Sequence, residues 1–82
     1  MSIQQSTRNA IADGVITAKV RAVLRQDPIT AHHDICVETL AGIVALSGFV
    51  ETDIVRIEAV QVTAHVRGVL HVKNLLDVRT FG

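Results

Sequence analysis

The amino-acid sequence predicts an α+β fold, a two-layer sandwich in which two helices pack on one face of a three-stranded sheet. Two segments carry aliphatic residues at helical spacing, three others alternate apolar and polar residues, and short links separate them. The predicted order is α-β-β-α-β. Because the 82 residues are fewer than the roughly 150 of a typical domain, we predict a single domain, over residues 12–80. The first residues are polar and unpatterned, so residues 1–11 are predicted to form a flexible N-terminal arm.

The first helix is predicted over residues 13–26. Its apolar residues share one helical face, namely Ile16, Val20, Val23 and Leu24. Asp13 is a suitable N-cap, because its carboxylate can accept a hydrogen bond from a free N–H of the first turn. Pro28 cannot continue the helix, so the helix ends before it.

The next two segments predict a β-hairpin. Residues 35–40 alternate with period two, and residues 43–50 are rich in β-branched and aliphatic side chains. Ala41 and Gly42 supply the turn between them. Gly48 lies inside the second strand, which indicates a bulge or a close approach of another backbone segment.

The second helix is predicted to begin after an N-cap at Thr52 or Asp53 and to end at Gly68, which follows Arg67 as a C′ glycine. Its buried stripe consists of Val55, Ala59, Val62 and Val66. We expect structural roles for all three glycines, Gly42, Gly48 and Gly68.

The last strand is predicted over residues 72–79 and, after a helical crossover, should run parallel to the second strand. Its neighbour in the sheet, the first or the second strand, is left open. Val72, Leu76 and Val78 share its inward parity with Asn74, whose amide we expect to bond a loop backbone.

Composition excludes several classes of function. Eight Lys+Arg balance eight Asp+Glu, and Trp and Tyr are absent, so nucleic-acid binding is not expected. No apolar run approaches the roughly 18 residues of a membrane span. The polar first ten residues contain no secretory signal. The single cysteine, Cys36, excludes an internal disulfide.

Neither a metal site nor catalysis is predicted. The histidines, His32, His33, His65 and His71, lack convergent ligand spacing. Ser47 has no patterned base, and no glycine-rich phosphate loop precedes a helix. We therefore expect a protein that is not an enzyme and binds no cofactor.

Aliphatic and glycine positions recur in a characteristic order along residues 12–79. The runs are Ile16-Thr17-Ala18-Lys19-Val20, Ile35-Cys36-Val37, Gly42–Val50, Val66-Arg67-Gly68-Val69 and Val72–Val78. This ordered set resembles the BON domain, named for bacterial osmotically inducible and nodulation proteins.

The resemblance implies a bacterial cell-envelope module, usually periplasmic or carried on a lipoprotein. Members of the family are linked to osmotic-shock protection and outer-membrane integrity, with phospholipid binding as the proposed activity and no catalysis. Other members are assembly modules of envelope proteins, and one relative with a peptidoglycan-binding domain binds potassium. The fold does not choose among these partners.

The outer side of the second helix is the first candidate contact surface. Ile57, Val60 and Ala64 cluster there, flanked by Arg56 and Arg67. An apolar stripe on a surface helix indicates a contact, either with a membrane whose anionic head groups suit the arginines or with another subunit. Burial under the N-terminal arm, through Ile3 or Ile11, is the third interpretation.

The sheet face away from the helices is the second candidate surface. It combines apolar and charged residues, namely Cys36, Ile43, Ala45, Phe49 and Leu75 with Glu38, Asp77 and Arg79. Two exposed apolar surfaces on so small a chain favour a homo-oligomer. A bulge at Gly48 would instead turn Phe49 inward.

These observations lead to two function hypotheses. The first is a non-catalytic envelope module that contacts a phospholipid membrane surface and supports envelope integrity or the osmotic stress response. The alternative is a homo-oligomerising assembly module that docks onto another envelope protein. A sensor of potassium or an osmolyte is a more distant third.

Overall fold

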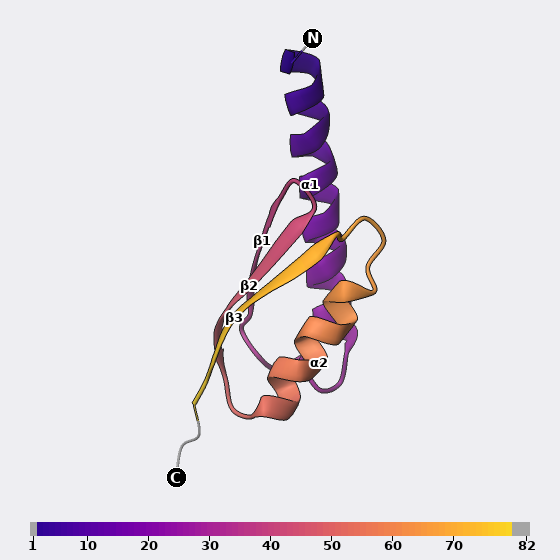
Figure 1. Ribbon diagram of the computed structural model, residues 1–82. Helices are drawn as coiled ribbons and strands as arrows, with labels where there is room; N and C mark the ends of the chain where they lie inside the picture. The colour runs from indigo at the N-terminus through magenta and orange to yellow at the C-terminus, as the bar shows by residue number, and fades with distance from the viewer. Residues whose placement is uncertain (1, 80–82) are drawn as a thin grey trace.

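The computed structural model describes the backbone of residues 2–79 and the side chains of residues 11–79. Two helices and three strands follow one another in the predicted α-β-β-α-β order (Figure 1). Their bounds are α1 (Ser2–Gln26), β1 (Cys36–Leu40), β2 (Ile43–Val50), α2 (Asp53–Ala64) and β3 (His71–Val78). The predicted α+β fold class is therefore confirmed.

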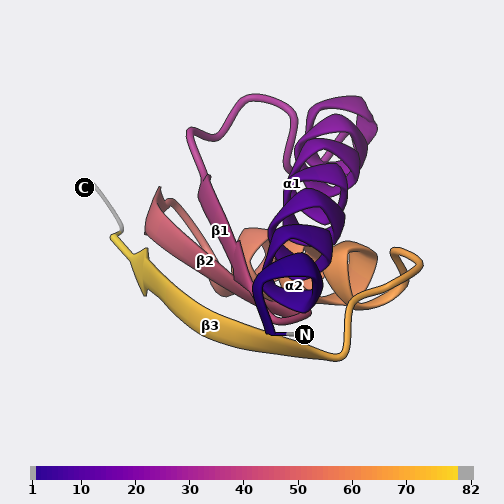
Figure 2. The ribbon, with the colours of Figure 1, turned by 90° about the horizontal axis from the view of Figure 1, so that it is seen from above.

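The sheet has the order β1-β2-β3, with β2 in the centre. Strands β1 and β2 pair antiparallel, and β3 pairs parallel with β2 after the crossover through α2, as predicted. The structure also answers the open question of strand order, since β3 lies beside β2. Both helices lie on the same side of the sheet (Figure 2).

The core between the helices and the sheet is aliphatic. Its buried members are Ile16, Val20, Leu24, Val37, Val44, Leu46, Val50, Val55, Ala59 and Leu76. The inward faces predicted from the helical and strand periodicity supply these residues. Phe49 does not belong to this cluster, and within the described residues aliphatic packing holds the layers together.

Helix α1 begins at Ser2 rather than at Asp13, so most of the segment predicted as a flexible arm continues the helix. The N-cap role of Asp13 is therefore wrong. Its carboxylate instead accepts hydrogen bonds from the backbone N–H groups of Ala41, at 2.8 Å, and Gly42, at 3.1 Å. One turn further along, Thr17 Oγ1 lies 2.7 Å from Thr39 Oγ1. These bonds attach α1 to the hairpin; the arm's flexibility and the domain boundary stay predictions.

The predicted Ala41-Gly42 turn is confirmed as a two-residue loop, since Leu40 pairs with Ile43. Ala41 has φ 52° and Gly42 has φ 80°. Two consecutive positive φ values give the backbone twist that a tight hairpin needs. Alanine is an unfavourable residue in this left-handed conformation, because its Cβ crowds the following carbonyl.

Gly48 is where another backbone segment approaches β2. A Cβ built on Gly48 would lie 2.9 Å from the carbonyl oxygen of Asp34, and its φ is 117°. The prediction of a close backbone approach is therefore confirmed. Phe49 nevertheless stays on the outer face, 56% exposed, so the interpretation that an irregularity turns it inward is wrong.

The end of α2 and one residue of β3 differ from the predictions. Thr52 is the N-cap, with its Oγ1 accepting from Val55 N–H, but the helix ends at Ala64. Gly68 is therefore not a C′ glycine; it has φ 100° in the following turn, where Ile16 packs against it. Asn74 is exposed on the edge strand, and its Oδ1 accepts from the N–H of Leu76 in the same strand rather than from a loop.

Replacement of Asp13 tests the bond between α1 and the hairpin. We expect Asp13→Ala to lower the free energy of unfolding by about 1–2 kcal/mol, because two backbone N–H groups lose a charged acceptor. Asp77→Ala, on the exposed face of β3, is the control and should change it by less than about 0.5 kcal/mol. Chemical denaturation measures both, and equal effects would contradict the role given to Asp13.

Replacement of Ala41 tests the strain in the turn. We expect Ala41→Gly to raise the free energy of unfolding by about 0.5–1 kcal/mol, since glycine tolerates positive φ. Ala31→Gly, at a position without positive φ, should lower it. A lower midpoint of thermal unfolding for Ala41→Gly would rule out this interpretation of the turn.

Candidate functional site

The structure exposes only part of the predicted α2 surface. Ile57 is 46% exposed and Ala64 is exposed, but Val60 is half-buried and packs against the core. The stripe is thus narrower than predicted, and Ile54, 67% exposed, extends it toward the helix N-terminus. As for a cover from the N-terminal segment, Ile11 is 64% exposed, and the side chain of Ile3 lies outside the described residues.

The two arginines predicted to flank that stripe have different surroundings. Arg56 Nε lies 2.9 Å from Asp53 Oδ1, one turn away on the same helix. Arg67 follows the end of α2 and lines a groove between α1 and α2. The two guanidinium groups therefore do not form one cationic border along the stripe.

Phe49 lies on the opposite side of the sheet from the helices, apart from the α2 stripe. Arg79 covers its ring, with the guanidinium carbon 4.1 Å from the ring centroid. Leu40, Ile43 and Leu75 are also exposed on this outer face. The predicted open sheet face is therefore present, and it is separate from the α2 stripe.

The outward side of α1 is a surface that the sequence analysis missed. Ile11, Val15 and Ala18 succeed one another at spacings of four and three and are exposed, with Ile11 at 64% and Val15 at 48%. Periodicity could have found the surface, because the apolar residues on this side have the same helical spacing as those of the core.

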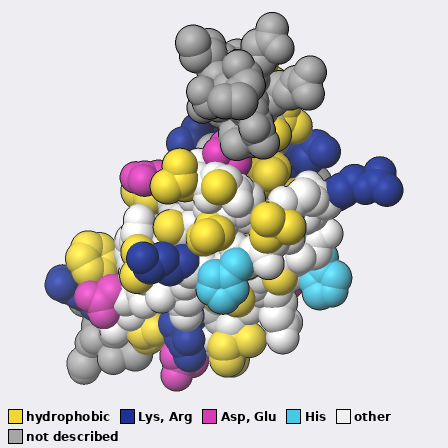
Figure 3. Space-filling view, turned by 45° about the horizontal axis from the view of Figure 1, so that its top comes forward, with side chains coloured by type: hydrophobic (Ala, Val, Ile, Leu, Met, Phe, Trp, Pro, Cys, Tyr) yellow, Lys and Arg dark blue, Asp and Glu magenta, His cyan; other side chains and the backbone are white. Residues whose placement is uncertain are grey.

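The exposed charges of α1 within residues 11–26 are all positive. Lys19, Arg21 and Arg25 are exposed, whereas Asp13, the single carboxylate in residues 11–26, is bonded to the hairpin turn. On the face of the molecule drawn in Figure 3, hydrophobic side chains gather over the domain, and Lys, Arg and His side chains lie at their margin. Although the chain has no net charge, this helix presents cations beside apolar side chains.

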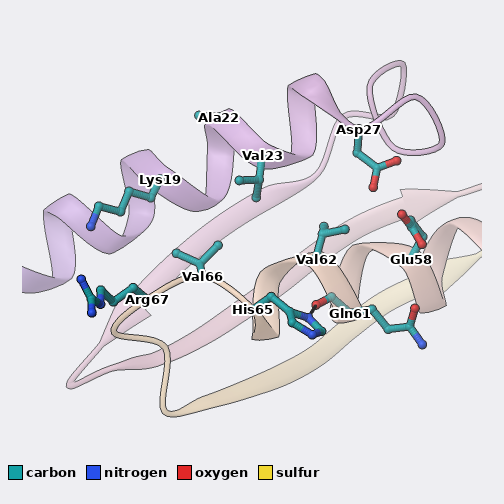
Figure 4. Close-up of a pocket in the computed structure, with 10 residues that line it drawn as sticks. All are labelled: Lys19, Ala22, Val23, Asp27, Glu58, Gln61, Val62, His65, Val66 and Arg67. Atoms are coloured by element: carbon teal, nitrogen blue, oxygen red, sulfur yellow. Dashed lines mark hydrogen bonds between the residues drawn. The ribbon is translucent and has the colours of Figure 1, made fainter.

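A groove of 710 Å³ runs between α1 and α2 (Figure 4). Its middle is mainly apolar and its ends are charged. The lining residues are Lys19, Ala22, Val23, Asp27, Glu58, Gln61, Val62, His65, Val66 and Arg67.

The two ends of this groove carry opposite charge. At one end Asp27 and Glu58 face each other; the interaction of the two carboxyl groups raises the pKa of Glu58 and lowers the pKa of Asp27. At the other end the side chains of Lys19 and Arg67 point toward one another (Figure 4). Within residues 11–79 none of these four side chains forms an ion pair.

The described residues contain no cluster of three or more metal-ligating side chains. The His65 ring lies in the groove with its Nδ1 2.7 Å from the carbonyl oxygen of Gln61. Cys36 is exposed on the open sheet face. In the part of the chain that the structure describes, no helix is both long and apolar enough to cross a membrane.

The fold and these surfaces define a small α+β module, and comparison with known proteins gives its family. The BON domain family model matches residues 12–80. The chain therefore belongs to the BON domain family, as its residues suggested.

One curated relative, osmotically-inducible protein Y of Escherichia coli (strain K12), is 44% identical over 71 residues. The match covers 87% of this chain but 35% of the relative, so the chain spans about a third of that protein's length. Both findings point to a family of non-enzymatic proteins.

The carboxyl pair makes the stability of the domain depend on pH. The folded-state pKa of Glu58 lies above its ordinary value of 4.5, so the stabilisation from its shared proton is present below 4.5 and is lost as the pH rises through the folded pKa. The lowered pKa of Asp27 acts in the opposite sense, and its contribution is lost as the pH falls below its ordinary value of 3.8.

We therefore expect Glu58→Gln to raise the midpoint of thermal unfolding at pH 7, because an amide can donate to Asp27 without a second negative charge. The gain should shrink at pH 4.5, where Glu58 retains more of its proton. Glu38→Gln, on the other face of the sheet, is the control. A gain that is the same at both pH values would show that charge repulsion is not its cause.

Proposed function

We propose that this chain is a non-catalytic module of the bacterial cell envelope, periplasmic or envelope-associated, that serves the osmotic stress response. Membership of the BON family supports this proposal, as does the similarity to a relative named for osmotic induction. Because the chain spans a third of that relative, the role concerns this domain and not the relative's whole activity.

The contact that we propose for this module is the surface of a phospholipid membrane. The observation that carries this proposal is the outward side of α1, where Ile11 and Val15 are exposed beside exposed cations. Amphipathic helices of this kind lie in the plane of the membrane interface, with apolar side chains in the acyl boundary and cations at anionic head groups.

The domain positions that helix for such a contact. Asp13 and Thr17 bond α1 to the hairpin from its inner side, so the side bearing Ile11 and Val15 faces away from the sheet. Arg21 and Arg25 are exposed further along the helix and can reach lipid phosphates. The helix is already folded before contact, which reduces the entropy lost on binding.

The second candidate function is that of an assembly module. Its support is the open sheet face, where Leu40, Ile43, Phe49 and Leu75 are exposed on three adjacent strands. An exposed apolar sheet face favours contact with another subunit or another envelope protein. The α2 stripe with Ile57 stays a candidate for either function.

Co-sedimentation with vesicles tests the lipid proposal. We expect the domain to pellet with vesicles rich in anionic phospholipid and to be released as salt rises, because head-group attraction is screened. The double variant Arg21→Glu with Arg25→Glu should lose at least about 90% of this binding, since each basic residue near an anionic surface contributes about 1 kcal/mol.

The double variant Lys73→Glu with Arg79→Glu has the same change in net charge but lies on β3 and the residue after it, so it should still pellet. Ile57→Glu serves as the test of the α2 stripe and should bind as the unmodified chain does. Loss of binding by Ile57→Glu but not by the α1 variant would move the membrane contact to α2. Absence of pelleting by the unmodified chain would overturn the lipid proposal.

A further inference from the structure

The groove between α1 and α2 holds two like-charge pairs that have no counter-ions within the described part of the chain. Asp27 and Glu58 bring two carboxyl groups together at one end, and Lys19 and Arg67 bring two cations together at the other. Like charges that face one another disfavour the isolated domain. An occupant with a cation at one end and an anion at the other would neutralise both ends.

The spacing of the two ends limits which occupants fit. Lys19 lies on α1 and Asp27 directly follows its last residue, so the two are eight residues apart, which corresponds to about 12 Å along the helix axis. A phospholipid head group holds its phosphate and its amine only a few ångströms apart, so one head group cannot reach both ends. The complementary occupant must carry its opposite charges on a rigid surface of similar length.

We propose that a second copy of this chain occupies the groove, so that two domains associate face to face about a two-fold axis. The axis lies in the plane of the contact and crosses the long direction of the groove at right angles, near Val23 and Val62. This rotation reverses the direction of the groove and places the cationic end of one copy on the anionic end of the other. A surface that is its own complement is what a two-fold dimer requires.

The proposed dimer has specific partners. Helix α1 lies antiparallel to its copy, so Lys19 of each chain meets the second copy's Asp27. Helix α2 also lies antiparallel to its copy, so Arg67 of each chain meets the second copy's Glu58. Four residues of each chain thus form four oppositely charged pairs across the contact. Each like-charge pair of the separate domains gains two counter-charges.

The middle of the groove suits this contact. Ala22, Val23, Val62 and Val66 line it with small aliphatic side chains, which allow two helix pairs to approach closely. Their limited area, with solvent-exposed charges at the ends, is typical of a weak and salt-dependent association. The proposal does not depend on the lipid contact, because Ile11, Val15, Arg21 and Arg25 lie outside the groove lining.

Sedimentation velocity over a concentration series at low salt tests this proposal. We expect a monomer–dimer equilibrium that weakens with added salt. Arg67→Glu and Glu58→Lys should each weaken the dimer about tenfold, because each removes two cross-subunit attractions. An equimolar mixture of the two variants should recover dimerisation, since its mixed dimer pairs the anionic end of the first variant with the cationic end of the second.

The recovery by mixing separates a surface contact from an effect on folding, because a misfolded variant would not be rescued by its partner. The Arg21→Glu with Arg25→Glu variant is the matched control and should dimerise as the unmodified chain does, whatever its effect on vesicle binding. A chain that stays monomeric at low salt and millimolar concentration overturns the proposal. A dimer that neither variant weakens overturns it as well, because another surface would then form the interface.

Discussion

Two hydrogen bonds between the Asp13 carboxylate and the turn of the β1–β2 hairpin fix the position of helix α1. Two backbone N–H groups, of Ala41 and Gly42, donate to this carboxylate at 2.8 and 3.1 Å. The Thr17 hydroxyl adds a third hydrogen bond to the hairpin, one turn later along α1. Because α1 makes these contacts from one side only, its rotation about its own axis is determined. Which side chains of α1 enter the core and which face outward follow from that rotation.

Both proposed surfaces depend on this placement of α1. A three-stranded sheet with two helices on one face buries a single aliphatic core, and the fold itself does not specify a partner. The placement turns Ile11 and Val15 outward and brings Lys19 and Asp27 to the edge that faces α2. The family gives the broad role, and the residues that α1 exposes give the proposed contacts their chemistry.

Local patterns were sufficient for most of the fold, whereas contacts between distant segments were not. The strands follow from periodicity, as do Val55 and Ala59 of the predicted α2 stripe, although Thr63 is buried in place of Val62. The parallel pairing of β2 with β3 follows from the helical crossover. The start of α1 was misjudged because residues 2–10 are polar and lack periodicity, yet contain no helix-breaking residue. The partner of Asp13 lies 28 residues away, and Asp27 lies 31 residues from Glu58. No local signal joins either pair, so neither the hairpin bond nor the charged groove could be predicted.

The central claim is that the outward side of α1 is where this BON domain contacts the membrane. Amide chemical shifts of the ¹⁵N-labelled chain, recorded as nanodiscs of anionic phospholipid are added, test it most directly. We expect the largest shifts and line broadening between Ile11 and Arg25, with β2 and β3 little changed. Changes centred on Phe49 and Leu75, or on Ile54 and Ile57, would contradict the claim and assign the contact to the sheet or to α2.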